Sequence, residues 1–304
     1  MYGAMIGDTV GSKYEFNNIK TKDFPLFSEG CAITDDSVMT VAVASAILKS
    51  RDEQYHSGKR TFRSILVEEM QRYGRRFPHP QGGYGGRFGQ WLQRENPEPY
   101  NSFGNGSAMR VSPCGIVAVC MEEAVALARA SASVTHDHPE GIKGAEVVAA
   151  AIFLAKMGKS REEIRSHICE HYYELNSTVD EIRVHYGFDE SCQRTVPEAL
   201  ICFLESKSFE DAIRNAISIG GDSDTVGAIT GSVAWTYYCR EKGYSQWVYE
   251  VPEEMAAIRQ QALAYIPEDF VKTAEELHEA AWQRMGTYGR VGSCTWILSP
   301  GEMG

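Results

Sequence analysis

Apolar residues recur with a helical period along most of the chain. Between residues 61 and 75, Phe62, Ile65, Leu66 and Tyr73 fall on one side of a 3.6-residue turn, with charged residues between them. A first helix is predicted at the start of the chain, ending at Gly11-Ser12. Further helices are predicted over residues 36–49, 61–75, 107–121, 122–132, 140–156, 160–175, 195–206, 208–218, 224–241, 253–264 and 268–283.

Two of these segments have almost no polar face. Residues 140–156 consist mainly of Ala, Val, Ile and Gly, and residues 224–238 consist mainly of small and apolar residues, so both helices are expected at the centre of the protein. No pair of alternating runs flanks an Asn-Gly or Asp-Gly turn, as a β-hairpin would require. The pattern predicts a compact all-α fold in one domain spanning 1–304, with an irregular tail over 286–304.

Composition narrows the functional classes. The chain has 304 residues, 43% of them hydrophobic, and a net charge of −11. An acidic protein lacks the basic face that nucleic acids and anionic membranes attract, so neither partner is expected. No segment reaches the roughly 18 apolar residues of a membrane span. The first residues show no basic region or cleavage site of a signal peptide. We expect a monomeric cytoplasmic protein.

Two short acidic motifs suggest a metal site. Thr34-Asp35-Asp36 and Asp222-Ser223-Asp224-Thr225 each precede or open a predicted helix, and each offers two carboxylates and a threonine hydroxyl. Oxygen ligands without sulfur or imidazole favour Mg²⁺ or Mn²⁺ over Zn²⁺. Two neighbouring ions are a common means of orienting and activating a substrate oxygen.

Helix capping is the simpler explanation for each motif alone. Threonine or aspartate before a helix is an ordinary N-cap, and acidic residues in the first turn favour the helix dipole. The second motif makes capping insufficient, because Gly220-Gly221 allows a tight turn and Asp222 and Asp224 then surround one point. A cap requires one such residue, not four.

Two glycine-rich segments suggest an anion site. Residues 82–89 contain Gly83-Tyr84-Gly85, and residues 103–110 contain Phe103-Gly104-Asn105-Gly106. Flexible loops would explain the first segment equally well. The second opens a predicted helix, where free backbone N–H groups suit a phosphate, and Phe103 offers a ring that can stack on a base.

The segment Thr135-His136-Asp137-His138-Pro139 has two interpretations. A His-x-His pair is able to bind a transition metal, whereas a polar loop before the 140–156 helix would need neither ring for chemistry. Because oxygen ligands are abundant elsewhere, we expect His136 to donate a hydrogen bond to a substrate.

In these motifs the chain resembles the ADP-ribosylglycohydrolases, the family that includes dinitrogenase reductase-activating glycohydrolase and the ADP-ribosyl-acceptor hydrolases. The likeness covers essentially the whole chain. It rests on six motifs in order, at residues 3–11 with Glu15, 34–36, 104–110, 135–139, 195–200 and 220–225. Asp137 stands where many relatives carry Asn.

The resemblance implies a compact orthogonal helical bundle around a binuclear Mg²⁺ or Mn²⁺ site. The implied metal ligands are Thr34, Asp35, Asp36, Asp222, Asp224 and Thr225. The implied ADP-ribose contacts are Gly83, Tyr84, Gly85, Ser102, Phe103, Gly104, Asn105 and His136. Glu15 matches a mobile carboxylate that borders the metals, and Glu15 and Asp36 are the candidate acid and base.

The implied activity is hydrolysis of the glycosidic bond between ADP-ribose and an acceptor, which is an arginine, a serine or a small molecule. Such a bond breaks through an oxocarbenium-like state. A catalytically silent ADP-ribose-binding or structural protein and a two-metal phosphoesterase are the alternatives that the motifs leave open.

Overall fold

The computed structural model describes residues 1–304 except 57–59, 242–250, 292–296, 299–301 and 303–304. Its described residues form helices and two isolated β-bridges, with no β-sheet, which confirms the all-α prediction. The helices, from the first third of the chain to the last, are α1 (Tyr2–Gly11), α2 (Asp35–His56), α3 (Phe62–Arg76), α4 (Gly86–Leu92), α5 (Gly106–Met109), α6 (Ser112–Val117), α7 (Met121–Ser133), α8 (Pro139–Lys156), α9 (Arg161–His171), α10 (Val179–His185), α11 (Cys192–Leu204), α12 (Phe209–Ser218), α13 (Ser223–Glu241), α14 (Glu253–Ala262) and α15 (Glu268–Val291).

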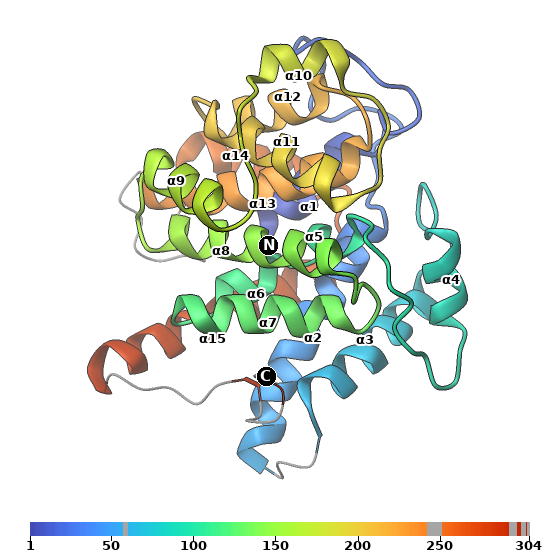
Figure 1. Cartoon of the computed structure of the whole chain (residues 1–304), viewed down its shortest axis with the longest axis vertical. Coiled ribbons are helices and arrows are strands. Elements are labelled where there is room, and N and C mark those ends of the chain that lie inside the picture. The colour runs from blue at the N-terminus through green and yellow to red at the C-terminus, as the bar shows by residue number, and fades with distance from the viewer. Residues whose placement is uncertain (57–59, 242–250, 292–296, 299–301, 303–304) are drawn as a thin grey trace.

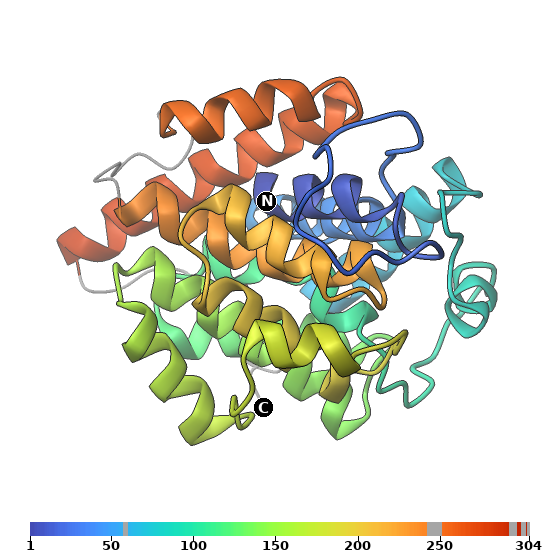
Figure 2. The same ribbon diagram turned by 90° about the horizontal axis from the view of Figure 1, so that it is seen from above.

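Helices α1 and α13 run through the middle of the bundle. Figure 1 shows α11 and α12 on one side of them and α8, α6 and α7 on the other. Seen from above, α14 and α15 cover a further side (Figure 2). The apolar segments predicted to be central are buried, since Val147 and Ala150 on α8 and Ile229 and Val233 on α13 have no exposed surface.

Glycines allow α1 and α13 to pack with their backbones in contact. A Cβ built on Gly7 would lie 1.9 Å from the carbonyl oxygen of Gly227, and one on Gly3 would lie 2.0 Å from that of Gly231. Gly11 likewise faces Ser223 and Asp224, at the first turn of α13. No larger side chain fits at these positions. The contact therefore fixes the end of α1 beside the acidic start of α13.

Several boundaries differ from the sequence predictions. The predicted helix 107–121 is two short helices, α5 and α6, because Pro113 has no N–H to continue the hydrogen bonds of α5 and instead lies in the first turn of α6. Helix α11 begins at Cys192, before the predicted start at residue 195, so Pro197 lies inside the helix. Helices α4 and α10 were not predicted. Helix α15 continues to Val291, into the segment 286–304 that was predicted to be irregular, and most of the remainder lies outside the described residues.

None of the helices described here is both long and apolar enough to cross a membrane. The loop between α1 and α2 and the segment around α4 lie on the same side of the molecule in both views (Figures 1 and 2). Both segments line the cavity described next.

Candidate functional site

A cavity of about 430 Å³ lies where the N-terminal ends of α2, α5 and α13 meet. Its lining combines segments that are far apart in the sequence. Of the residues predicted for the site, those in the lining are Glu15, Asp35, Asp36, Gly83, Tyr84, Gly85, Ser102, Gly104, Asn105, His136, Asp222, Asp224 and Thr225. Thr34 and Phe103 are the two predicted residues that the lining does not include.

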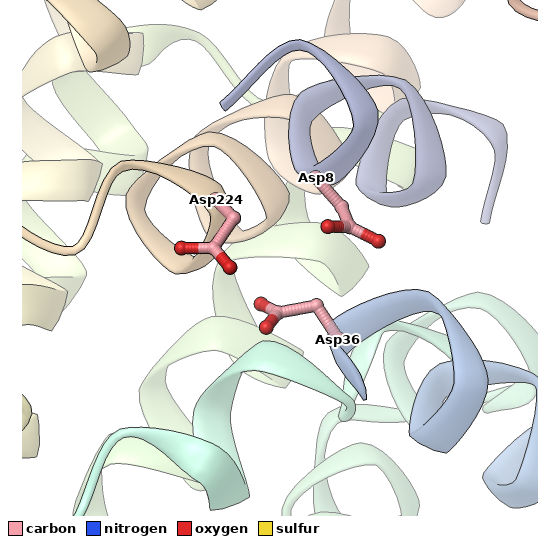
Figure 3. A group of neighbouring side chains, drawn as sticks. All are labelled: Asp8, Asp36 and Asp224. Carbon is pink, nitrogen blue, oxygen red and sulfur yellow. The ribbon is translucent and has the colours of Figure 1, made fainter. Parts of the chain in front are cut away.

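Three buried aspartates converge at the floor of the cavity. Asp8 comes from α1, Asp36 from the first turn of α2 and Asp224 from the first turn of α13, and Figure 3 shows their carboxylates pointing toward one another. One oxygen of each lies within 4.8 Å of the others. A second group with the same spacing joins Glu15, Asp222 and Asp224. Asp224 belongs to both groups and so links them.

Asp8 is held by the start of α2. One carboxylate oxygen accepts a hydrogen bond from the Thr34 hydroxyl at 2.7 Å. The other accepts from the backbone N–H groups of Thr34 at 3.1 Å and Ser37 at 3.0 Å, and from the Ser37 hydroxyl. These bonds orient Thr34, whose oxygen also lies 3.3 Å from Asp36 Oδ2. On the other side, the Thr225 hydroxyl donates to the same Asp36 oxygen at 3.3 Å.

Three carboxylate oxygens at this floor have no hydrogen-bond partner among the described residues. Asp36 Oδ1, Asp224 Oδ1 and Glu15 Oε2 are buried without a hydrogen bond. A buried carboxylate oxygen normally has a donor or a cation beside it, because desolvating it alone is costly. The donor set consists only of oxygens, which matches the preference of Mg²⁺ and Mn²⁺. The residues present therefore fit divalent cations.

Without cations, the buried carboxylates at the floor repel one another when ionised. Burial, followed by the neighbouring carboxylates, raises the pKa of Asp36 well above its usual value. Burial likewise raises the pKa of Asp224, Asp222 (to about 7) and Asp35, each with further contributions from neighbouring acids. Like charges in a low-dielectric site disfavour ionisation of each other. Bound cations would reverse that effect.

Glu15 lies on the loop that follows α1. Burial, followed by the charges of Asp224 and Asp8, raises its pKa to about 8. The loop is tied to the start of α13, because Asn18 donates to the Gly221 carbonyl at 2.9 Å and accepts from the Gly221 N–H at 2.8 Å. Gly82, with a φ of +77°, comes so close that a Cβ there would lie 2.6 Å from Glu15 Oε2. A carboxylate on such a loop has more freedom than one on a helix.

Asn105 connects the glycine-rich segment to the acidic floor. Its side-chain amide donates to Asp222 Oδ2 at 2.6 Å and to the Thr195 hydroxyl at 3.1 Å. Its backbone N–H donates to the Glu190 carbonyl at 2.7 Å. Ser102 accepts from the Gly104 N–H at 3.1 Å. The glycines of the 82–89 segment also line the cavity, and Cβ atoms built at Gly83, Gly85 and Gly86 would meet no described atom within 4 Å, so this part of the lining leaves room for a ligand.

The aromatic and histidine residues divide between the cavity and the surface. Phe103 is 48% exposed, and its ring lies 5.4 Å from that of His138. His138 caps α8, because its Nδ1 accepts the Glu140 N–H at 3.1 Å. The His-x-His pair is therefore split: His138 has a structural role, whereas His136 is buried and lines the cavity.

Several residues at the site have no role predicted from the sequence. Asp8 lies in the motif at residues 3–11 and beside Asp36 and Asp224, although the cavity lining does not include it, and nothing in its apolar helix marks it as part of the site. The lining residues without a predicted role include two rim phenylalanines whose rings lie 6.1 Å apart, Phe16 and Phe188. They also include Arg87, Tyr100 and Glu190. These last residues carry no local pattern, and only the tertiary fold brings them to the cavity.

Comparisons with known proteins identify the family of the chain. The ADP-ribosylglycohydrolase family model matches residues 1–286. The chain is 25% identical to human (Homo sapiens) ADP-ribosylhydrolase ARH3, over 81% of this chain and 86% of that protein. It is 26% identical to ADP-ribosylarginine hydrolase Tri1 of Pseudomonas putida (strain GB-1), over 83% and 72%.

A solved structure supports the fold. A chain described as "ADP-ribosylglycohydrolase-related protein complex" superposes with a TM-score of 0.65 at 21% identity, covering 92% of this chain and 95% of that one. At this identity the likeness concerns architecture. Together with the family match across most of the sequence, it shows that the chain belongs to the ADP-ribosylglycohydrolase family.

Proposed function

We propose that this protein is a metal-dependent hydrolase that cleaves the glycosidic bond between ADP-ribose and an acceptor. The observation that carries the proposal is the convergence of unpaired, buried carboxylate oxygens at the floor of a cavity whose walls are glycine-rich. Such a floor suits divalent cations, and such walls allow close approach of a phosphorylated ligand. Family membership supplies the substrate class.

Two divalent ions, Mg²⁺ or Mn²⁺, would be held by Thr34, Asp35, Asp36, Asp222, Asp224 and Thr225. Asp8 accepts the hydrogen of the Thr34 hydroxyl, and the Asp36 N–H donates to the same oxygen at 3.2 Å, which leaves one lone pair of that oxygen for a cation. Bound ions would supply positive charge that fixes the ribose hydroxyls and favours ionisation of a water.

The ligand is proposed to lie along the walls. Ser102, Gly104 and Asn105 on one side and Gly83 and Gly85 on the other would hold the diphosphate, with Tyr84 and His136 beside them. Phe103 would stack on the adenine from the rim. Because both walls are set by backbone segments, their positions depend on the fold more than on side-chain rotamers.

Glu15 and Asp36 are the proposed catalytic carboxylates. Glu15 lies on a loop, and its raised pKa suits a group that carries a proton near neutral pH. Protonated Glu15 would give its proton to the leaving acceptor atom, and the resulting carboxylate would take a proton from the water that attacks the anomeric carbon of the ribose. Asp36 lies deeper, between two threonine hydroxyls, and would stabilise positive charge on the ribose.

Product analysis tests the proposal against its alternatives. Proteins carrying ADP-ribosyl-arginine or ADP-ribosyl-serine are incubated with the protein and Mg²⁺, with and without EDTA. We expect free ADP-ribose, and we expect EDTA to abolish it. Binding without release would indicate a silent ADP-ribose-binding protein, and AMP or phosphate would indicate a phosphoesterase. The preferred acceptor follows from the two substrates compared side by side.

A further inference from the structure

A buried line of three side chains ends at the cavity. Arg110, on the turn after α5, donates one hydrogen of Nη2 to the Ser131 carbonyl at 2.9 Å and the other to the Thr135 hydroxyl at 2.8 Å. The Thr135 hydroxyl lies 2.7 Å from Nδ1 of His136. Arg110, Thr135 and His136 are 1%, 0% and 5% exposed, so water does not compete for these bonds.

The direction of each hydrogen bond follows from the chemistry of its donor. A guanidinium has donors and no acceptor, so Thr135 Oγ1 must accept from Arg110. The threonine hydroxyl has one hydrogen, and His136 Nδ1 is its only recorded acceptor within the described residues. If Nδ1 carried the imidazole proton, the hydroxyl would accept twice and its own hydrogen would be buried without a partner. A buried hydroxyl hydrogen without an acceptor is costly. If Nδ1 is unprotonated, the Thr135 hydroxyl donates to it and each of these polar atoms has a hydrogen-bond partner.

The imidazole therefore accepts at Nδ1. Burial, then the charges of Arg110 and Arg87, lowers the pKa of His136 well below its usual value, so the ring is neutral at working pH. A neutral ring that accepts at Nδ1 carries its proton on Nε2.

Nε2 faces the ligand cavity. A Cβ built on Gly106 would lie 3.2 Å from Nε2, and one on Gly104 would lie 3.5 Å from it. Both glycines line the cavity, and no hydrogen-bond partner for Nε2 is found among the described residues. The Tyr100 ring, 5.9 Å from the imidazole, packs on the same side and restricts the ring's orientation.

We propose that Arg110 and Thr135 are positioning residues that lock His136 in the Nε2–H tautomer, so that it donates a hydrogen bond to an acceptor oxygen of the bound ligand. The identity of that ligand, ADP-ribose, rests on the proposed function, whereas the tautomer does not. The same lock keeps His136 from ligating a transition metal, because one ring nitrogen is engaged and the other is protonated.

The tautomer is measured directly by ¹⁵N–¹H correlation spectra of the full-length protein labelled at histidine. The His136 signals are identified as those lost in His136→Gln. We expect a pyridine-like Nδ1 and a pyrrole-like Nε2 in the unsubstituted protein, with no need of ligand. A pyrrole-like Nδ1 would overturn the proposal, whatever the substituted proteins do.

Thr135→Val and Thr135→Ser form a matched pair for the positioning role. Valine keeps the shape and removes the hydroxyl, whereas serine keeps the hydroxyl. We expect Thr135→Val to show mixed tautomers and to bind ADP-ribose about fivefold more weakly, the effect of one hydrogen bond, and Thr135→Ser to restore both properties. An Nε2–H ring with unchanged affinity in Thr135→Val would contradict the proposal. If the unsubstituted protein fails to bind ADP-ribose at all, the proposed function fails while the spectrum still decides the tautomer.

Discussion

The floor and the rim of the cavity differ in burial, in charge and in the local structure that carries their side chains. At the floor, Asp8, Asp36 and Asp224 are 0–3% exposed and sit on helices, two of which touch through their backbones. At the rim, Phe16 is 75% exposed, Phe188 49% and Phe103 48%, and all three are on loops. The floor concentrates charge at fixed positions at the expense of stability, whereas the rim leaves apolar rings free to meet a ligand.

Because of this contrast, we expect substitutions at the floor to cause the largest loss of activity. Asp224→Asn removes the carboxylate shared by both acidic groups, while its shape stays the same. We expect Mn²⁺ affinity to fall sharply and hydrolysis to drop by at least about a hundredfold, because the ions would lose a common ligand. Asp23→Asn, the same change on the exposed part of the loop between α1 and α2, serves as the control. A fully active Asp224→Asn protein would remove the basis for a binuclear site.

Glu15, at the boundary between floor and rim, separates binding from turnover. Glu15→Gln keeps the side-chain shape but cannot transfer a proton, so we expect turnover to fall by roughly 10²–10⁴ while Mn²⁺ and ADP-ribose affinities stay the same. Glu190→Gln neutralises another carboxylate of the same cavity and controls for charge. Normal turnover of Glu15→Gln would show that Glu15 has no role in catalysis. Loss of metal binding in this variant would show that Glu15 is a metal ligand.

Burial of the carboxylates at the floor makes the stability of the metal-free protein depend on pH. Asp8, Asp222 and Glu15 have folded pKa values raised to about 6, 7 and 8, so the metal-free folded state binds more protons than the unfolded chain between about pH 4 and 8. The free energy of unfolding contributed by these groups is therefore greatest at low pH and falls as the pH rises.

This pH dependence is tested by comparing Asp224→Asn with the unsubstituted protein. A comparison is needed because the buried histidines His136 and His278 have lowered pKa values, so their contribution to stability changes with pH in the opposite direction. In EDTA, we expect Asp224→Asn to melt above the unsubstituted protein at pH 8, with the gap closing toward pH 5. Added Mg²⁺ should reverse the order at pH 8. Parallel melting curves at all pH values would show that the floor carries no such strain.

The smallest effect is expected at the rim. Phe103→Ala should weaken ADP-ribose binding by roughly 1–3 kcal/mol if the ring stacks on adenine. In the structure this ring packs beside His138, outside the cavity lining, whereas Phe188 is equally exposed and does line it. Calorimetry on Phe103→Ala and Phe188→Ala decides between them: a loss confined to Phe188→Ala would move the adenine to the other side of the mouth.

How much the sequence predicts also differs between regions. Periodicity identifies the long helices and the buried centre, because these depend on local patterns such as the apolar run 140–156. The motifs at 34–36 and 222–225 were predicted to share one site, and in the structure they lie at the starts of α2 and α13, where Asp36 and Asp224 come close together. The capping box of Thr178 and Glu181 is a local sequence signal for the start of α10.

Asp8 and the rim residues depend on contacts that no local pattern reveals. Asp8 reaches the floor only because Gly7 and Gly227, more than two hundred residues apart, bring two backbones together. Glu190 reaches the cavity because its carbonyl accepts the N–H of Asn105. Distant pairing of this kind is set by tertiary packing, which sequence periodicity does not encode.

The account's central claim is a metal-dependent release of ADP-ribose from an acceptor. The most direct measurement is chromatographic analysis of products from ADP-ribosylated arginine and serine substrates, after EDTA treatment and again after Mg²⁺ or Mn²⁺ is restored. The account predicts that intact ADP-ribose is released only when the divalent ion is present, and not by Asp224→Asn. ADP-ribose release in EDTA, or AMP in place of ADP-ribose, would contradict it.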